Sequence, residues 1–538
     1  MAPPCAGARA AALLLGAAAL LGAAAAQSLS FDFDGAAPLH RVSPRYVCFN
    51  IDTGSLYNGM NFSDAVFRQL VANLALGGAG AGSIIRIGGT AVDSSFYFPD
   101  APYHIGAPNQ CGGNCPNGSS DIGNAMLTAV FDFIVAVPGM SLLWDVNGES
   151  FRQGNGPWSA AGNATAMLAF IEARYGGKID FAYSVGNEPD LWKISPPVSA
   201  ATLGTDALAM KAALAPLNIG RGVYGSSWAR ISTDDAQGFM PVVVAGGGIE
   251  GYTVHNYPYG GRDCIVANYL NKSKVTADLY DKLAAVAAVK AATPGAESLL
   301  LVLEETAGSS GGGCDNVTDR FVAGFCWMNT LMTVGRAGFD RVHRQDIAGW
   351  SFAFGMSHYQ LVGPPGWVVG SELLTPHPDY FTTLLWRQIV GDAVLATTVA
   401  GGAAAQAGVE LGVWCASETS PFGAGTVVMP YANTLNVSVA ISVPASLLGA
   451  ATVRFSLTAP GGDLQADGML LNGELLALNA DGSLKDYPIS GKLAPAAPQV
   501  TVEAFSYGFV AYEAPIGACA AAEAAIAEAA ADDAAAAS

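Results

Sequence analysis

Between about residue 45 and residue 390, short continuous apolar runs alternate with longer stretches of helical pattern. The runs are SIIRIGG (83–89), SLLWDVNG (141–148), FAYSVGNEP (181–189), GYTVHNYP (251–258) and SLLLVLEET (298–306). The stretch 277–292 is one of the Ala- and Leu-rich helical segments between them. Buried parallel strands read as continuous apolar runs, and their alternation with helices is typical of repeated βα units. The pattern therefore predicts an α/β protein with a (β/α)8 TIM barrel.

Polar residues stand where several of these runs end. They are Arg86, Asp145, Asn187, Glu188, His255 and Glu305. In a (β/α)8 barrel, the carboxyl ends of the strands carry the active site. We therefore expect these side chains to meet at one mouth of the barrel.

After about residue 395 the helical period disappears. Residues 408–513 hold short strand-like segments separated by turn signals, which predicts a C-terminal antiparallel β-sandwich. The segment SLSFDF (28–33) also alternates between apolar and polar residues and is expected to add a strand to that sandwich.

The N-terminus has the pattern of a cleaved signal peptide. Arg9 precedes an apolar, Ala-rich stretch at 11–26, and Ala24 and Ala26 match a signal peptidase site. A membrane anchor is the alternative, but the stretch is short for a span of ~20 residues. No later segment is expected to span a bilayer. The expected organisation is a signal peptide (1–26), an N-terminal strand region (27–44), the barrel (45–392), the sandwich (393–519) and an Ala-rich tail (520–538).

Cysteine usage agrees with secretion. Cys5 lies in the signal peptide, and the other eight of the nine cysteines form an even set, which favours disulfides in an oxidising compartment. Cys111 and Cys115 lie in a loop rich in Gly, Asn and Pro, where a local disulfide is a better interpretation than half of a metal site. We therefore expect a secreted protein, or one delivered to a vacuole or lysosome, with no metal and no cofactor.

The charge balance excludes one class of partner. The chain has 25 Lys and Arg against 44 Asp and Glu, a formal charge of −19. Nucleic-acid binding needs clustered cations, so no nucleic-acid partner is expected. The sequence does not indicate an oligomeric state.

Two acidic motifs indicate the chemistry. Gly186-Asn187-Glu188-Pro189 ends one apolar run, and Leu303-Glu304-Glu305-Thr306 ends another. Two carboxylates facing each other across a barrel mouth are what glycoside hydrolysis requires, and Asn187 is placed to bind a sugar 2-hydroxyl. Neighbouring strand residues point in opposite directions, so alternation alone allows either Glu304 or Glu305 to face the barrel axis.

Several longer motifs resemble one family. LVLEETAGSSGGG, DRFVAGFCWMNTL, HRQ and SHYQLV follow one another along the chain, with GNEP before them and LLNGELL and AFSYGFV after them. This series, within about 45 to 519, resembles the heparanase group, glycoside hydrolase family 79. The resemblance implies a barrel with a β-sandwich and a retaining mechanism, with Glu305 as the nucleophile and Glu188 as the acid/base.

The resemblance also implies substrate contacts. It assigns sugar hydroxyl contacts to Asp52, a contact with the nucleophile to Tyr257, and binding of a uronic acid carboxylate to Gly311, Gly312 and Tyr359. Successive backbone N–H groups can bind an anion without a side-chain charge, which would let so acidic a protein hold an acidic sugar. The resemblance further implies a disulfide between Cys415 and Cys519.

Two features of mammalian heparanases are missing from the sequence. It has neither a long excised linker between residues 100 and 140 nor a basic cluster for sulfated chains. The sequence therefore predicts a secreted retaining β-glucuronidase whose partner is a glucuronic-acid-containing glycan, without support for proteolytic maturation or heparan sulfate cleavage. The alternatives are a carbohydrate-binding or cell-wall protein without catalysis, and a glycosidase of the same clan acting on neutral sugars.

Overall fold

The computed structural model describes residues 28–77, 82–105, 120–159, 162–217, 221–261, 263–351, 355–363 and 374–520. The predicted signal peptide, the pair Cys111 and Cys115, and nearly all of the Ala-rich tail lie outside the described residues.

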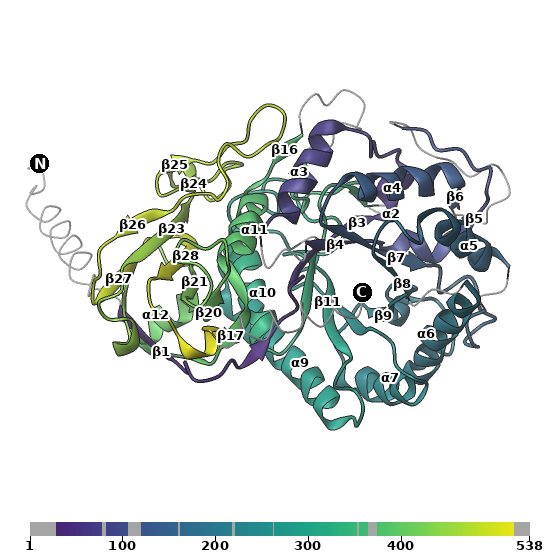
Figure 1. Ribbon diagram of the computed structural model, residues 1–538, viewed down its shortest axis with the longest axis horizontal. Helices are drawn as coiled ribbons and strands as arrows, with labels where there is room; N and C mark the ends of the chain where they lie inside the picture. Colours follow the sequence, from purple (N-terminus) through teal and green to yellow (C-terminus); the bar gives the residue numbers. More distant parts are fainter. Residues whose placement is uncertain are drawn as a thin grey trace, which may run out of the picture.

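Within these ranges, eight parallel strands close into a barrel, which confirms the predicted fold (Figure 1). The strands are β3 (Val47–Asp52), β4 (Ser83–Gly88), β7 (Met140–Val146), β8 (Phe181–Val185), β9 (Val223–Trp228), β10 (Gly251–Asn256), β11 (Leu300–Thr306) and β12 (Arg341–Arg344), with β12 pairing back to β3. Every residue of β3, β4, β7 and β9 is buried, which explains their continuous apolar runs.

Helices surround the barrel strands (Figure 1). The longer ones are α3 (Ala65–Ala75), α4 (Asn124–Ala136), α5 (Asn163–Tyr175), α6 (Ala200–Leu214), α7 (Thr233–Ala245), α9 (Lys272–Ala292), α10 (Ala323–Arg336) and α11 (Pro378–Ile389). Asp64, Ser199 and Ser232 begin α3, α6 and α7, and each side chain accepts a backbone N–H of the first turn.

Short elements decorate the loops between these strands and helices. They are α2 (Thr53–Tyr57), η1 (Thr90–Ser94), β5 (Ser95–Tyr97), β6 (Ser120–Ile122), η2 (Pro189–Leu191), η3 (Ala215–Leu217), α8 (Val266–Tyr269), β13 (Trp350–Ser351), β14 (Gly355–Met356), β15 (Val362–Gly363) and β16 (Thr375–Pro376).

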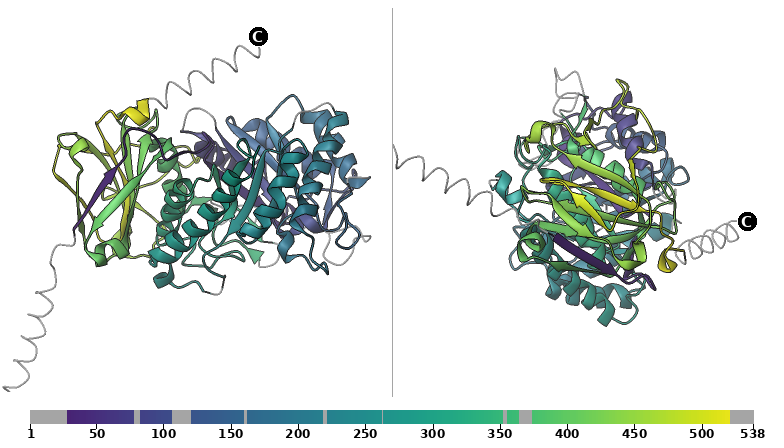
Figure 2. Two further views of the ribbon diagram at one scale, coloured as in Figure 1. Left: turned by 90° about the horizontal axis from the view of Figure 1, so that it is seen from below. Right: turned by 90° about the vertical axis from the view of Figure 1, so that its left-hand side faces the viewer.

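A second, strand-rich domain packs against one side of the barrel (Figure 2). One sheet has the order β18 (Thr397–Gly401), β1 (Ser28–Phe33), β22 (Val439–Ser442), β27 (Gln499–Val502). The other runs through β2 (His40–Arg41), β17 (Val390–Leu395), β20 (Val413–Ala416), β21 (Val427–Asn433), β28 (Ser506–Tyr512), β23 (Thr452–Thr458), β24 (Leu470–Leu471) and β25 (Glu474–Leu475), with β19 (Val409–Leu411) on β21 and β26 (Lys492–Ala494) on β23. Three short helices complete this domain: α12 (Ala403–Gly408), η4 (Ala445–Leu447) and η5 (Pro460–Gly462). Apolar side chains from both sheets form one core between them, as in a β-sandwich.

Helices α10 and α11 lie between the barrel and the second domain (Figure 1). Every residue of α11 is buried, and in α10 only Arg336 is not. Aromatic rings make the contact from both sides: Trp386 packs on Trp414 with ring centroids 5.3 Å apart, and Phe325 packs on Tyr507 at 5.0 Å. The two domains therefore share an apolar interface.

Two disulfides lie within the described residues. Cys415 pairs with Cys519, as the family resemblance implied, and ties the C-terminal segment to the second domain. Cys264 pairs with Cys314, a pairing that the sequence alone did not indicate. Cys48 and Cys326 are buried free thiols.

Candidate active site

Glu188 lies on a tight turn directly after β8. The turn begins with Gly186 at φ 76°, and Glu188 itself adopts a left-handed conformation at φ 50°, ψ 56°. Its backbone N–H donates to the Ser227 carbonyl at 2.9 Å. The Glu188 side chain keeps 19% of its surface exposed, so it can reach a ligand at the barrel mouth.

Glu304 and Glu305 lie near the carboxyl end of β11, at two depths below the surface. The Glu304 side chain is fully buried and accepts a hydrogen bond from Ser227 Oγ at 2.5 Å. The Glu305 carboxylate lies closer to the surface, where it accepts from the Tyr257 hydroxyl at 2.6 Å and from Arg86 Nη1 at 2.8 Å. The Tyr257 contact is the one that the resemblance implied.

Both of these glutamates approach the same cation. Arg86 Nε lies 3.6 Å from Glu304 and Nη1 lies 2.8 Å from Glu305. Simple strand alternation would have turned one of them away from the axis, but the pairing of β10 with β11 shifts register between Val254 and His255, opposite these glutamates. Alternation alone could not have predicted this local geometry.

The two predicted catalytic carboxylates face each other. One oxygen of Glu188, one oxygen of Glu305 and a ring nitrogen of His255 all lie within 4.8 Å of one another. His255 Nδ1 is 3.2 Å from Glu188 Oε1 and 3.8 Å from Glu305 Oε2. The barrel thus joins residues from three different strand ends into one cluster.

The buried charges of this cluster set its protonation. Burial opposes the charge on His255, but Glu305, Glu188 and Glu304 outweigh it and raise the pKa of His255 to about 9. Glu188, His255 and Glu305 lie close enough to hold a metal ion together, and a cation there would compete with the proton on His255. For Glu305 burial also opposes ionisation, but His255 and Arg86 outweigh it and lower the pKa of the carboxyl. Glu305 is therefore a carboxylate at neutral and mildly acidic pH.

Arg86 organises the floor of the site. Besides Glu305, it donates from Nη2 to Asp145 at 2.5 Å and to the Asn187 side-chain oxygen at 2.8 Å. Because the Asn187 oxygen is engaged, its side-chain NH₂ is the group left to face a ligand. Arg86, Asp145 and His255 stood out in the sequence as strand-end polar residues, but nothing there revealed which groups they would pair with.

The predicted carboxylate-binding residues also lie beside the cluster. The Tyr359 ring stacks on the Tyr257 ring with centroids 6.3 Å apart, and the Gly312 carbonyl accepts from His358 N–H at 2.6 Å. Gly311 and Gly312 have φ values of 68° and 87°, a region that favours glycine. Among the described residues, the N–H groups of these two glycines donate no hydrogen bond.

Asp52 occupies the end of β3, as expected, and caps a helix there. Its Oδ1 accepts from Gly54 N–H at 2.7 Å at the start of α2, and burial raises the pKa of its carboxyl well above the ordinary value. Its predicted contact with sugar hydroxyls stays a prediction.

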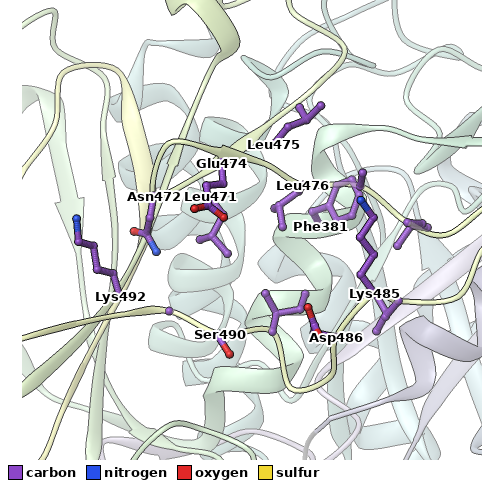
Figure 3. Close-up of a pocket in the computed structure, with 15 residues that line it drawn as sticks. Phe381, Leu471, Asn472, Glu474, Leu475, Leu476, Lys485, Asp486, Ser490 and Lys492 are labelled. Carbon is purple, nitrogen blue, oxygen red and sulfur yellow. The ribbon is translucent and has the colours of Figure 1, made fainter.

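A separate pocket of about 650 Å³ lies on the second domain (Figure 3), and its lining includes neither Glu188 nor Glu305. Hairpin β24–β25 and the chain up to Lys492 form most of its wall, and Phe381 of α11 also lines it. Two lysines and two acids, Lys485, Lys492, Glu474 and Asp486, contribute opposite charges. The lining therefore does not favour a ligand of either charge.

Comparison with curated proteins identifies heparanases among the relatives of this chain. No family model matches the chain. Human inactive heparanase-2 is 29% identical over 271 residues, which cover 49% of this chain and 42% of that protein, so the match spans less than half of that relative. Bovine (Bos taurus) heparanase is 24% identical over 527 residues, covering 90% of this chain and 91% of the relative. This chain is similar to the heparanases. The resemblance that the sequence motifs predicted is thereby confirmed.

The heparanase-like chain also resembles a plant protein and several solved structures. Baicalin-beta-D-glucuronidase of Scutellaria baicalensis is 25% identical over 267 residues, 46% of each chain. A 4-O-alpha-L-rhamnosyl-beta-D-glucuronidase of Fusarium oxysporum 12S superposes with a TM-score of 0.60 at 15% identity, covering 90% of this chain and 99% of that structure. An alpha-L-arabinofuranosidase of Thermotoga maritima gives 0.58 at 14% identity with the same coverage. These structures establish the shared fold, including the second domain.

Proposed function

We propose that this protein is a retaining β-glucuronidase, a glycoside hydrolase acting on β-linked glucuronic acid in glycans. The observation that carries the proposal is the pair Glu188 and Glu305, with carboxylate oxygens within 4.8 Å of each other. Retaining glycosidases place their carboxyl groups roughly 5–5.5 Å apart, whereas inverting enzymes leave roughly 6.5–9.5 Å for a water.

In the proposed first step, Glu305 attacks the anomeric carbon and forms a covalent glycosyl-enzyme, while Glu188 donates its proton to the departing oxygen. In the second step Glu188 takes a proton from water, and the water oxygen displaces Glu305 from the sugar. Glu305 suits the first role because His255 and Arg86 keep it ionised. Glu188 suits the role of acid/base because its side chain is partly exposed and can exchange protons with water.

The substrate is proposed from groups around this pair. The N–H groups of Gly311 and Gly312, which donate to no group among the described residues, would hold the uronic acid carboxylate together with Tyr359, and the Asn187 amide would donate to the 2-hydroxyl. The names of the relatives support glucuronides: baicalin-beta-D-glucuronidase, and the Hirudo nipponia hyaluronoglucuronidase at 26% identity over 380 residues.

The first test compares wild-type turnover of an aryl β-glucuronide and the matching aryl β-glucoside. We expect turnover of the glucuronide alone, with the sugar released in the β configuration when followed by NMR at early times. Glu305→Gln should abolish turnover. Release of the α anomer would refute the retaining mechanism, and equal turnover of the glucoside would favour a glycosidase of neutral sugars.

The similarity to inactive heparanase-2 favours a second candidate, a carbohydrate-binding protein without catalysis. The presence of both carboxylates and their cationic neighbours is the reason for ranking it second. If wild-type protein binds glucuronides by calorimetry but releases no sugar from any of them, this candidate replaces the first.

We further propose delivery through the secretory route, to the cell exterior, a vacuole or a lysosome. Two disulfides, Cys264–Cys314 and Cys415–Cys519, suit an oxidising compartment. Among the described residues, no helix combines the length and apolar character needed to cross a bilayer.

A further inference from the structure

Asp93, in the turn after β4, is buried with 4% exposure and takes no part in the chemistry proposed above. Its Oδ1 accepts the backbone N–H groups of Gly148 at 2.9 Å and Glu149 at 3.3 Å. Its Oδ2 accepts the Asn187 backbone N–H at 3.0 Å and Trp192 Nε1–H at 2.8 Å. One carboxylate thus joins the loops that follow three neighbouring barrel strands, β4, β7 and β8.

Burial of the Asp93 carboxylate is energetically unfavourable. Within the described residues no Lys or Arg forms an ion pair with it, and burial raises the pKa of Asp93 to about 7 despite the hydrogen bonds that oppose the shift. An acid that served only to fill this space could be replaced by a neutral residue without desolvating a charge. We therefore look for the role of Asp93 in the groups that its carboxylate binds.

What Asp93 holds is the turn that carries Glu188. Three successive N–H groups of this turn are fixed: Gly186 to the Val146 carbonyl at 2.8 Å, Asn187 to Asp93, and Glu188 to the Ser227 carbonyl at 2.9 Å. A left-handed conformation at a non-glycine residue costs about 1–2 kcal/mol, so the Glu188 backbone keeps it only while its surroundings enforce it. The central one of these three restraints is the Asp93 carboxylate.

Trp192 adds a second connection. Its Nε1–H lies 2.8 Å from Asp93 and 2.9 Å from the Asn187 carbonyl. Its six-membered ring packs so closely on Gly186 that a Cβ there would lie 2.7 Å from Cζ2. Asp93 therefore restrains the turn directly through Asn187 and indirectly through this indole.

We propose that Asp93 is the positioning residue of the acid/base: it holds the Gly186–Glu188 turn so that the Glu188 carboxyl points at the oxygen of the departing group. This inference rests on the proposed function for its catalytic consequence. Loosening the turn would leave Glu305 in place, because Tyr257 and Arg86 hold it, and Arg86 keeps its contacts with Asp145 and Glu304 when the one to Asn187 is lost. The loss should therefore fall on proton transfer to the leaving group and not on nucleophilic attack.

The kinetic test uses Asp93→Asn with aryl β-glucuronides whose leaving groups span a wide pKa range. An amide at position 93 would present an NH₂ to groups that are themselves donors. We expect kcat/KM to fall about 100-fold or more for the poorest leaving group and little for the most activated, because general-acid catalysis contributes roughly 10²–10⁴-fold. Because Asn187 in the same turn is proposed to bind the 2-hydroxyl, a change in KM common to the whole series is expected, and the dependence on the leaving group is the quantity that tests the proposal. An equal fall across the series would overturn the proposal, because a general loss of fold gives that pattern.

Asp340→Asn is the matched control. Asp340 is a buried acid that accepts the Leu301 backbone N–H at 2.8 Å, at the opposite end of the barrel from Glu188. This variant should show no dependence on the leaving group. Asp93→Ser, which keeps a hydroxyl acceptor and does not present an amide to the donors, should give the same trend as Asp93→Asn with a smaller amplitude.

A second measurement does not need activity. Amide hydrogen exchange of residues 186–192 should be at least 10-fold faster in Asp93→Asn than in wild type, while exchange in β11 stays unchanged. If wild-type protein fails to cleave any glucuronide, the proposed function is wrong, and exchange alone decides whether Asp93 holds the turn. Unchanged exchange at 186–192 would overturn the inference even in an active enzyme.

Discussion

Glu188 and Glu305 differ in how much of their surroundings is fixed. Glu305 receives hydrogen bonds from Arg86 and Tyr257, whereas the Glu188 side chain is partly exposed with His255 at 3.2 Å. A nucleophile needs a fixed, ionised carboxylate, and an acid/base must exchange protons with solvent once in each cycle. The two environments match these different demands.

Replacement of the acid/base should therefore depend on the leaving group. Glu188→Gln should reduce kcat/KM by about 10²–10⁴-fold for an alkyl or sugar glucuronide, because only poor leaving groups need a proton in the transition state. With an activated aryl glucuronide, the first step, which forms the covalent glycosyl-enzyme and releases the aryl group, should still proceed. Burst kinetics with that substrate provide the measurement, and uniform inactivation of all substrates would argue against this assignment.

His255 should make the stability of the fold depend on pH. Its pKa is raised to about 9 in the folded protein, above the ordinary 6.5, so its contribution is fully present below pH 6.5 and is lost as the pH rises through 9. The shift corresponds to a loss on the order of 3 kcal/mol in the free energy of unfolding. Urea unfolding at several pH values between 6 and 10 measures it. His255→Gln should flatten this dependence, and an equally steep loss in the variant would exclude His255 as the source.

The sequence predicted those features of the site that lie within one short segment, and it did not predict the contacts between distant segments. The runs ending in Glu188 and Glu305 are local patterns, and the barrel rule together with the resemblance brought them together correctly. Contacts such as Arg86 with Glu305, 219 residues apart, and Asp93 with Asn187, 94 residues apart, depend on how strand ends align around the barrel. No local sequence pattern encodes that alignment, so the sequence did not indicate a role for Asp93.

Among the structural elements, the loop that follows β11 has an unusual restraint. It contains Gly311 and Gly312, and the disulfide Cys264–Cys314 ties it to the loop after β10. Glycine has more backbone conformational freedom than any other residue, so a ligand-binding loop built from glycines is flexible unless it is restrained. The disulfide offsets that freedom and holds the loop against Tyr259, whose carbonyl accepts the Ser310 N–H at 2.9 Å.

Removing this disulfide should weaken substrate binding and stability together. Closing a loop of 50 residues contributes roughly 4 kcal/mol in the chain-entropy model. In the Cys264→Ser/Cys314→Ser variant we expect a lower Tm and a raised KM for glucuronides, with kcat changed much less. Cys415→Ser/Cys519→Ser is the control, since that disulfide lies in the second domain. It should lower Tm without raising KM.

The protein as a whole is expected to unfold as one unit. Helices α10 and α11 are buried between the barrel and the second domain, and Gly324 contacts Tyr507 so closely that a Cβ would lie 2.0 Å from its hydroxyl oxygen. If one domain unfolded alone, the other would expose the apolar surface of this interface to water. Such a partly folded state is therefore disfavoured.

Gly324→Ala tests this coupling. We expect a loss of about 1–3 kcal/mol, the usual cost of overpacking a core, with a single unfolding transition in calorimetry. Gly177→Ala, at a position where a Cβ would contact nothing within 4 Å, should leave Tm nearly unchanged. Two separated transitions in the Gly324→Ala scan would show that the domains are independent.

Strand β1 has a consequence for synthesis of the chain. Strand β1 (Ser28–Phe33) pairs with β18 (Thr397–Gly401) and with β22 (Val439–Ser442), so it leaves the ribosome roughly 370–410 residues before these partners, or roughly 20–80 s at 5–20 residues per second. During that interval all eight strands of the barrel are completed, while Leu29 and Phe31 have no sheet to cover them. The second domain thus closes around a segment that has waited through the synthesis of the barrel, and any delay in that closure leaves an apolar strand edge accessible to chaperones or to other nascent chains.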